Sequence, residues 1–374
     1  MEFRFATPAD KQDLLDFINL IFSQTSRPHR FERLLPKAYA ENVERSDIHA
    51  VAVCDGRIRG CVGVYPFTLT VAGEPLKVGY VGSVSVHPSA RGQGVMKRLM
   101  SMQLQRARET GLDMLLLGGQ RQRYEYYGFE PCGAAYHYEV TQANLRHCWS
   151  DLDVSGLSFE PLASADYAYE LYGAQPVTGA RTREGFIAAC QSFGGQPWLI
   201  RRDGKEAGYL IASGEGRGLT ELVLEEEAFI PGVVKAWMEK NDRRDLSIRV
   251  APHDEPLNRA LAAFAEGYSI AADGAMNCLN PSKVIGAYLR LKNRLSPLSD
   301  GVLRLGIRGA EAFEIAVEDG RVRIASPSGP LDAELDGLQA TRLAFDYNRF
   351  GAPRVACPSD WFPLPQSLPI ADTF

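Results

Sequence analysis

The feature that most constrains the fold is an apolar strand that leads through a short glycine-containing turn into a helix. Residues 81–86 alternate valine with smaller side chains, which is typical of a strand, and the turn at 87–94 follows directly. A helix is predicted from about 95 to 110, and the apolar run at 114–117 (MLLL) predicts a buried strand. Strands and helices therefore alternate here, and we expect a mixed α/β (α+β) fold.

The turn at 87–94 has the chemistry of a phosphate-binding loop. Backbone N–H groups at a helix start lack intrahelical partners and lie at the positive end of the helix dipole, so they can bind a pyrophosphate. Gly92 and Gly94 allow close approach of the backbone, and Arg91 adds a cationic donor. The turn matches neither a P-loop nor a dinucleotide fingerprint. An ordinary strand–turn–helix is the alternative for so short a motif.

An aromatic segment at 123–131 (RYEYYGFEP) follows the buried strand. A phenol at Tyr124, one strand over from the turn, can protonate a departing thiolate. Packing is the alternative role for such a cluster, and we assign it to Tyr126, Tyr127 and Phe129.

The chain repeats one pattern of elements. Apolar spacing predicts an amphipathic helix over 8–24, and Asp55-Gly56 between alternating runs predicts a hairpin with a tight turn. Asp203-Gly204 lies in a similar hairpin pattern, followed by a strand at 220–224 and a helix pattern at 228–242. This order favours a duplicated fold, with two unrelated α+β units as the alternative.

The last segment opens with a helix pattern at 282–293 and continues with alternating strands at 302–307, 313–317 and 322–324. It ends in a proline-rich tail and carries no visible catalytic motif. Binding, packing or assembly are the roles that remain open for it.

Composition argues against several classes of protein. The 41 basic and 46 acidic residues give a net charge of −5, which lacks the basic excess of a nucleic-acid binder and mildly favours cationic partners. No apolar stretch is long enough to span a membrane, and the start has no secretory signal, so we expect a cytoplasmic protein. The seven cysteines are scattered without CxxC spacing, so we expect neither a disulfide framework nor a metal site.

Taken in order, these motifs resemble the GNAT superfamily of acetyl-CoA-dependent N-acetyltransferases. Its acyl-CoA loop is [QR]-x-x-G-x-[GA], which residues 91–96 (RGQGVM) fit except at the last position, Met96. Its thiolate-protonating tyrosine lies in Tyr-x-x-x-Gly-Phe, which residues 124–129 fit fully. The resemblance implies acetyl-CoA contacts from the backbone of Val84 and Val86 and from the amides of Arg91, Gly92, Gln93, Gly94, Val95 and Met96.

The resemblance further implies direct attack of a free amine on the thioester in a ternary complex, with Tyr124 as the acid. Cys132 follows the tyrosine segment, but no histidine base stands beside it, so we interpret it as structural. Between the strand and helix of the second unit stand Glu225, Glu226 and Glu227, whose charge would repel phosphate. We therefore expect no catalysis in the second unit.

Met96 and its continuation GVMKRLM resemble the enhanced-intracellular-survival subfamily of aminoglycoside and lysine acetyltransferases. That resemblance implies two tandem GNAT-like domains with central mixed sheets flanked by helices, and a sterol-carrier-like α+β domain. The expected boundaries are 1–147 for a catalytic domain, 148–280 for a degenerate one and 281–374 for the last. The subfamily tends to be hexameric, so we expect a homo-oligomer.

The general base is not visible on the strand at 80–86, which has no acidic residue. The subfamily resemblance suggests the terminal carboxylate of Phe374. An α-carboxyl has a pKa of roughly 3.3–3.7, so it needs desolvation to act as a base, or it fixes the amine while water takes the proton. The alternative is a frayed, exposed terminus.

We therefore expect an N-acetyltransferase that moves an acetyl group from acetyl-CoA to a primary amine of a cationic small molecule or lysine side chain, without a metal. One alternative is a non-catalytic protein that binds or senses acyl-CoA, against which the acid Tyr124 argues. The other is a lipid-binding protein whose C-terminal domain carries the function. The sequence does not identify the acceptor.

Overall fold

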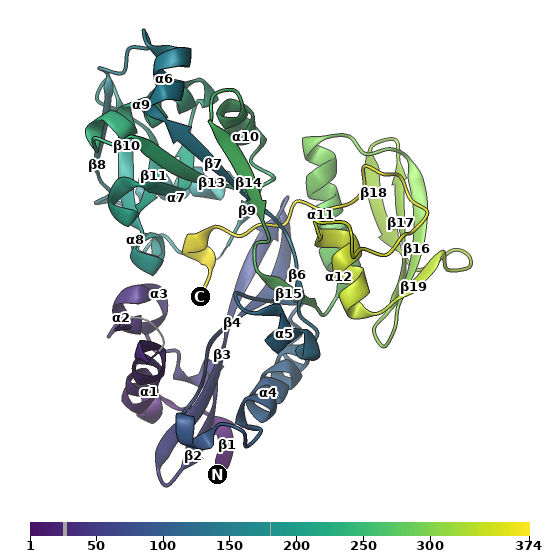
Figure 1. The fold of residues 1–374 in the computed structure, drawn as a ribbon. Coiled ribbons are helices and arrows are strands. Elements are labelled where there is room, and N and C mark those ends of the chain that lie inside the picture. Colours follow the sequence, from purple (N-terminus) through teal and green to yellow (C-terminus); the bar gives the residue numbers. More distant parts are fainter. Residues whose placement is uncertain (25–27, 180) are drawn as a thin grey trace. The chain divides into compact units, whose positions relative to one another are not determined.

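The computed structural model describes residues 1–24, 28–179 and 181–374. Helices flank mixed sheets along the chain, which confirms the mixed α/β class (Figure 1). Over these residues, no helix combines the length and apolar character that a membrane crossing requires.

The chain forms two compact units, and neither is a single stretch of sequence. Unit 1 contains residues 1–133, residues 274–364 and Phe374. Unit 2 contains residues 134–273 and 365–373. The boundaries of these units lie at 133 and 274, whereas the three-domain division at 147 and 280 stays a prediction.

The first sheet, in unit 1, has the strand order β1-β2-β3-β4-β5-β15-β6. Neighbouring strands are antiparallel except β4 and β5, which run parallel from the pair Val78–Met114 to the pair Val81–Leu117. The predicted hairpin at Asp55-Gly56 joins β2 to β3. The strands are β1 (Glu2–Phe5), β2 (His49–Cys54), β3 (Arg57–Val71), β4 (Glu74–Val86), β5 (Met114–Leu117), β6 (Glu130–Pro131) and β15 (Ala275–Cys278).

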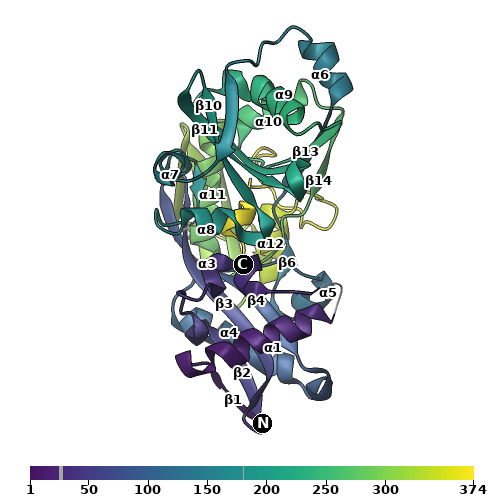
Figure 2. The ribbon, with the colours of Figure 1, turned by 90° about the vertical axis from the view of Figure 1, so that its left-hand side faces the viewer.

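Helices cover both faces of this sheet, as side-chain alternation requires. Ala50 and Ala52 of β2 face the core under α4 (Val95–Glu109), while Val51 faces the core under α1. Figure 2 shows α1 crossing in front of the strands. The helices on its side are α1 (Lys11–Ser23), α2 (Phe31–Leu34) and α3 (Pro36–Tyr39).

The second sheet, in unit 2, has the order β14-β7-β13-β12-β11-β10-β8. Asp203-Gly204 joins β10 to β11, and β12 and β13 form its parallel pair. Its strands are β7 (Ala135–Thr141), β8 (Leu157–Pro161), β10 (Gln196–Arg202), β11 (Lys205–Ser213), β12 (Gly218–Leu224), β13 (Asp245–Val250) and β14 (Gly267–Ala271), and unit 2 also holds the short β9 (Val177–Thr178). Its helices are α6 (Gln142–Trp149), α7 (Asp166–Gly173), α8 (Phe186–Cys190), α9 (Ile230–Lys240) and α10 (Glu255–Ala262).

The two sheets follow the same plan, but the strand that pairs with the second member of the parallel pair comes from a different place in the chain in each sheet. In both, antiparallel strands lead to one parallel pair and then to two more antiparallel strands. The strand next to β5 is β15, which follows the last strand of the second sheet in sequence. The strand next to β13 is β7, which directly follows β6. The predicted duplication is thus present, with an exchange of strands.

A smaller sheet in unit 1 has the order β18-β17-β16-β19 and contains the three strands predicted for this region. Helix α11 packs on β17 and β18, and α11 also contacts β3 and β4. Its elements are α11 (Pro281–Leu295), β16 (Gly301–Ile307), β17 (Ala312–Glu318), β18 (Arg321–Ala325), β19 (Ala333–Leu335) and α12 (Gly337–Phe345).

Candidate functional site

The site lies where β4 separates from β5. The parallel pairing ends at Val81 and Leu117, but β4 continues to Val86. On its other side, β4 has two residues, Ser83 and Val84, opposite the single residue Val62 of β3, which is a β-bulge. The end of β4 therefore bears backbone groups without a β5 partner, and such an edge can pair with an extended ligand.

The loop after β4 leads directly into α4. His87 accepts a hydrogen bond from the Ser89 amide and Gln93 donates one to the Ser89 carbonyl, so the loop is held by its own residues. Gly92 and Gly94 have φ values of 75° and 73°, a region that favours glycine, and Gly94 caps α4. A Cβ atom at either glycine would meet nothing within 4 Å, so the backbone faces open space. The first amides of α4 are therefore accessible to an anion.

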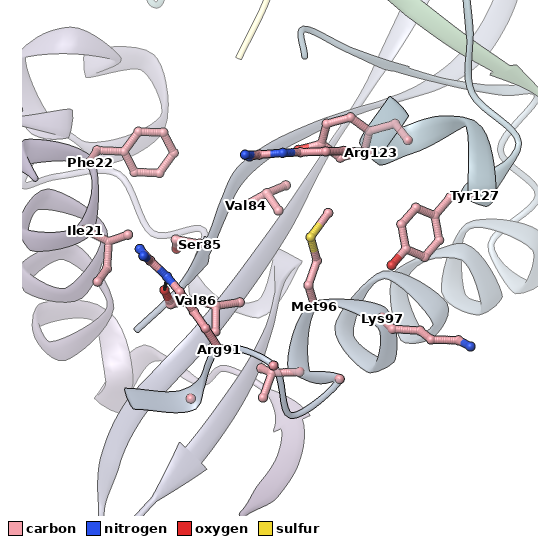
Figure 3. A pocket seen from close by; sticks show the side chains of 15 residues that line it. Ile21, Phe22, Val84, Ser85, Val86, Arg91, Met96, Lys97, Arg123 and Tyr127 are labelled. Carbon is pink, nitrogen blue, oxygen red and sulfur yellow. Dashed lines mark hydrogen bonds between the residues drawn. The ribbon is translucent and has the colours of Figure 1, made fainter. Parts of the chain in front are cut away.

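A cavity of about 750 Å³ extends along this loop and the end of β4 (Figure 3). It brings together most residues that the sequence singled out. Of these, its walls contain Val84, Val86, Arg91, Gly92, Gly94, Val95, Met96 and Tyr124. Gln93 and Phe374 are not part of the wall. The remaining wall residues are Ile21, Phe22, Ser85, Ala90, Lys97, Arg123 and Tyr127. Tyr127, which the sequence assigned to packing, thus borders the cavity, and Tyr126, assigned the same role, is exposed.

The charged side chains in the wall are all cationic: Arg91, Lys97 and Arg123. Arg91 Nε donates to the Val86 carbonyl at 3.4 Å, and Lys97 Nζ lies 5.1 Å from the Tyr126 ring centroid. In Figure 3, the Arg123 side chain points toward Phe22. The site thus has the charge that a phosphate-bearing ligand requires.

Tyr124 ends the short helix α5 (Arg121–Tyr124), and its ring is fixed by its neighbours. A Cβ on Gly119 would lie 2.5 Å from Tyr124 Cε2, so only glycine allows the ring to rest there. Phe129 packs edge-on at a centroid distance of 6.3 Å. Burial raises the pKa of Tyr124 above its ordinary value. The phenol therefore keeps its proton at neutral pH, as a general acid must.

Phe374 packs within unit 1 rather than fraying. Its ring stacks on Tyr65, with centroids 4.7 Å apart and planes at 14°, and Lys37 Nζ lies 3.9 Å from its centroid. Its main-chain oxygen lies beside Gly82, just before the bulge, 3.4 Å from where a Cβ would stand. The carboxylate is thus next to the strand end that borders the cavity.

Sequence reasoning missed Arg123, although it directly precedes Tyr124. It also missed Ile21 and Phe22, because their apolar spacing indicates only that this side of α1 is buried. The sequence signal for Arg123 was a cation directly before the tyrosine motif, which packing alone does not require. Within the described parts of the chain, no group of three histidine, cysteine or acidic side chains could hold a metal.

The second sheet has no equivalent loop. Glu225, Glu226 and Glu227 are exposed between β12 and α9, and this connection contains no glycine. Pro231, at the second position of α9, lacks an N–H group. Charge and backbone both oppose a phosphate there.

Comparisons with known proteins agree with this geometry. Residues 2–132 match the family model of an acetyltransferase (GNAT) domain. Three solved structures share the fold: a GCN5-related N-acetyltransferase from Kribbella flavida, one from Anabaena variabilis, and Eis1 from Mycobacterium abscessus. No curated protein matches the chain.

The likeness to these structures extends over nearly the whole chain at low identity. The Kribbella protein is 17% identical with a TM-score of 0.66, covering 91% of this chain and 88% of that one. The Anabaena protein is 16% identical with a TM-score of 0.65, covering 91% and 89%. Eis1 is 14% identical with a TM-score of 0.65 and covers 100% of both chains. At these identities the likeness shows the fold alone.

Proposed function

Since residues 2–132 carry an acetyltransferase (GNAT) domain, we propose that the protein transfers an acetyl group from acetyl-CoA to a primary amine. The observation that carries the proposal is one cavity with an anion-binding helix start at Gly94, the free end of β4, and the acid Tyr124 in its wall. Arg91 and the amides from Gly92 to Met96 hold the pyrophosphate. The backbone of Val84 and Val86 binds the pantetheine amides.

In the proposed reaction, the neutral amine nitrogen attacks the thioester carbonyl carbon and forms the new C–N bond. The C–S bond breaks, and the phenol of Tyr124 gives its proton to the departing sulfur. The excess proton on nitrogen goes to water or to the main-chain carboxylate of Phe374, which lies beside Gly82. A carboxylate there also favours the binding of a cationic amine. We assign no catalysis to unit 2.

The whole-length likeness to Eis1 supports a wider proposal on organisation. A catalytic GNAT domain at 1–147 precedes a degenerate one at 148–280 and a sterol-carrier-like domain at 281–374. The protein works in the cytoplasm as a homo-oligomer, up to a hexamer, and belongs to the enhanced-intracellular-survival-like subfamily. Light scattering tests the assembly, and a monomer at working concentration would contradict it.

The test of function is thiol release from acetyl-CoA in the presence of polyamines, aminoglycosides or lysine peptides. Tyr124→Phe is expected to lower kcat roughly 100-fold and to leave the Kd of acetyl-CoA unchanged, because it removes only a proton donor. Tyr268→Phe, at an exposed tyrosine of unit 2, is the matched control and should retain activity. Acetyl-CoA binding without amine-dependent turnover would indicate a sensing protein instead.

The role of Phe374 needs its own experiment. Extending the chain by two glycines moves the carboxylate away from Gly82 but keeps the ring. We expect a lower kcat with the same affinity for acetyl-CoA. Full activity of the extended protein would leave water as the base.

A further inference from the structure

The bulge in β4 holds a strained residue at the point where the strand enters the site. Ser83 has a φ of 54°, in the left-handed region that non-glycine residues seldom adopt. The next residue, Val84, lines the cavity. Such strain persists only where the surroundings hold it, so the contacts of the bulge indicate what fixes the strand.

On the α1 side of the sheet, two buried tyrosines hold Ser83, and a buried histidine contacts them. Tyr39 Oη lies 2.6 Å and Tyr65 Oη 2.9 Å from Ser83 Oγ. Tyr39 Oη also lies 2.9 Å from His49 Nε2. We call Tyr39, His49, Tyr65 and Ser83 the hydroxyl cluster.

The position of His49 determines which groups of the hydroxyl cluster donate and which accept hydrogen bonds. Its Nδ1 faces the carbonyls of Arg45 at 3.1 Å and Ser46 at 3.2 Å, and because carbonyls only accept, Nδ1 carries the proton. Nε2 then accepts from Tyr39. Burial lowers the pKa of His49 to about 4, so the ring is neutral at physiological pH. Donation from Tyr65 through Ser83 and Tyr39 to His49 satisfies these three distances, and the Tyr65 hydroxyl also contacts the Tyr39 hydroxyl and lies 3.3 Å from His49 Nε2.

On the α4 side, one buried amide holds the opposite strand. Gln103 Nε2 donates to the carbonyl of Val62 at 2.6 Å and to that of Ile48 at 2.8 Å. Val62 is the residue that faces the bulge, and Gln103 is 3% exposed. The same helix begins at Val95, in the wall of the cavity. Gln103 therefore ties the bulge to the helix that presents the phosphate-binding amides.

We propose that the hydroxyl cluster and Gln103 are positioning residues that fix the bulge from both faces of the sheet. They set the spacing between the anion-binding start of α4 and the free end of β4. A ligand with a phosphate-bearing half and an extended amide-bearing half can then bind the helix start and the strand end at the same time. This inference rests on the proposed use of acetyl-CoA and adds residues that do not touch it.

The test compares two ligands on the same variants. Adenosine 3′-phosphate 5′-diphosphate probes the helix start alone, and acetyl-CoA probes the helix start and β4 together. For Tyr39→Phe and Gln103→Met, calorimetry should show acetyl-CoA binding weakened roughly tenfold, the size of one buried hydrogen bond, and nucleotide binding unchanged. Equal losses for both ligands, or no loss for either, would overturn the proposal.

Two controls exclude a general loss of stability. Gln105→Met changes the same residue type on α4, where Gln105 donates to Glu109 on the surface at 2.8 Å. Tyr209→Phe removes a buried hydroxyl in unit 2 that bonds Glu221. Both should bind the two ligands as the wild type does. A control that weakens acetyl-CoA selectively would also contradict the proposed roles.

Substitutions at Ser83 separate strain from hydrogen bonding. Ser83→Ala keeps the strained φ and loses both bonds, whereas Ser83→Gly loses the bonds but adopts this φ freely. We expect Ala to weaken acetyl-CoA more than Gly does, and equal affinities would contradict a role for the strained residue. Failure of the wild type to bind acetyl-CoA would refute the proposed function itself, a result distinct from variants that bind like the wild type.

Discussion

The two units share one strand order, but one buried polar cluster in each differs in charge from the other. In unit 1, the hydroxyl cluster is neutral and lies beside the β4 bulge. In unit 2, Arg181 Nη2 lies 2.7 Å from Glu221 Oε2, and Arg181 Nε lies 2.8 Å from Asp372 Oδ1. Tyr172 donates to Asp372 and Tyr209 to Glu221 in the same cluster. One similar scaffold thus contains two kinds of polar core.

The neutral and the ionic cluster lie next to different parts of their units. The wall of the cavity in unit 1 is already cationic, and a neutral cluster next to it leaves the field of Arg91, Lys97 and Arg123 unchanged. In unit 2, the charges hold the segment with Asp372, which is far from its partners in sequence. Removing one hydrogen bond from a neutral cluster costs little stability. Removing one charge from an ionic cluster leaves its partners as buried, unpaired charges, which costs much more.

The strongest way to break the ionic core is Arg181→Met. The Arg181 side chain is 1% exposed, so its loss leaves two buried carboxylates uncompensated and should lower the free energy of unfolding by about 3–5 kcal/mol. Urea denaturation measures the effect. Arg183→Met, two residues along at an exposed ion pair, should change stability little. Equal stabilities for the two variants would contradict the ionic core.

Acid should destabilise the protein through one buried, neutral histidine in each unit. Burial lowers the pKa of both His49 and His253 from 6.5 to about 4. Between these values the unfolded chain binds a proton that the folded chain excludes, so stability falls as the pH falls from 6.5 through 4. Each histidine contributes up to about 3 kcal/mol of this loss.

The measurement is the pH dependence of the unfolding free energy. His49→Gln and His253→Gln should each flatten the profile over this window, and the double variant should flatten it further. A variant with the slope of the wild type would mean that the histidine is protonated in the fold. If both variants flatten the pH profile equally, the loss of stability in acid comes from burial of a neutral histidine and not from the neighbouring polar groups, which differ between the units.

The smallest effect is expected from the glutamates that precede α9. Replacing Glu225, Glu226 and Glu227 by glutamine removes exposed charge, but the connection still lacks glycine and Pro231 still lacks an N–H group. We therefore expect no gain of nucleotide binding in unit 2. Titration with adenosine 3′-phosphate 5′-diphosphate in an Arg91→Ala, Gly94→Val background checks this. New binding would show that charge alone disables the second unit.

The locally determined elements could be predicted from the sequence. Asp55-Gly56 and Asp203-Gly204 joined hairpins as expected, and the helix predicted from residue 95 is α4, because turn chemistry and apolar spacing act over a few residues. The cavity wall then gathers most of the predicted loop residues, since loop and helix are contiguous.

What could not be predicted depends on distant pairing. The alternating pattern of β7 is the same whichever sheet it joins, so nothing local indicates that it pairs with β13. Gln103 has no signal in its own neighbourhood, because its partners are the carbonyls of Ile48 and Val62, more than 40 residues away. The register shift opposite Val62 is equally invisible until β3 and β4 are paired.

The exchange of strands has a consequence for synthesis on the ribosome. Leu117 ends β5, but its partner strand β15 begins at Ala275. This edge of β5 therefore stays unpaired until most of unit 2 has been synthesised. At translation rates of about 5–20 residues per second, that wait lasts roughly 10–30 s. During this interval an apolar strand, Met114–Leu117, has an open edge, the condition under which nascent chains pair with the wrong partner. Yields of folded protein should therefore rise when chaperones that cover exposed apolar strands are abundant.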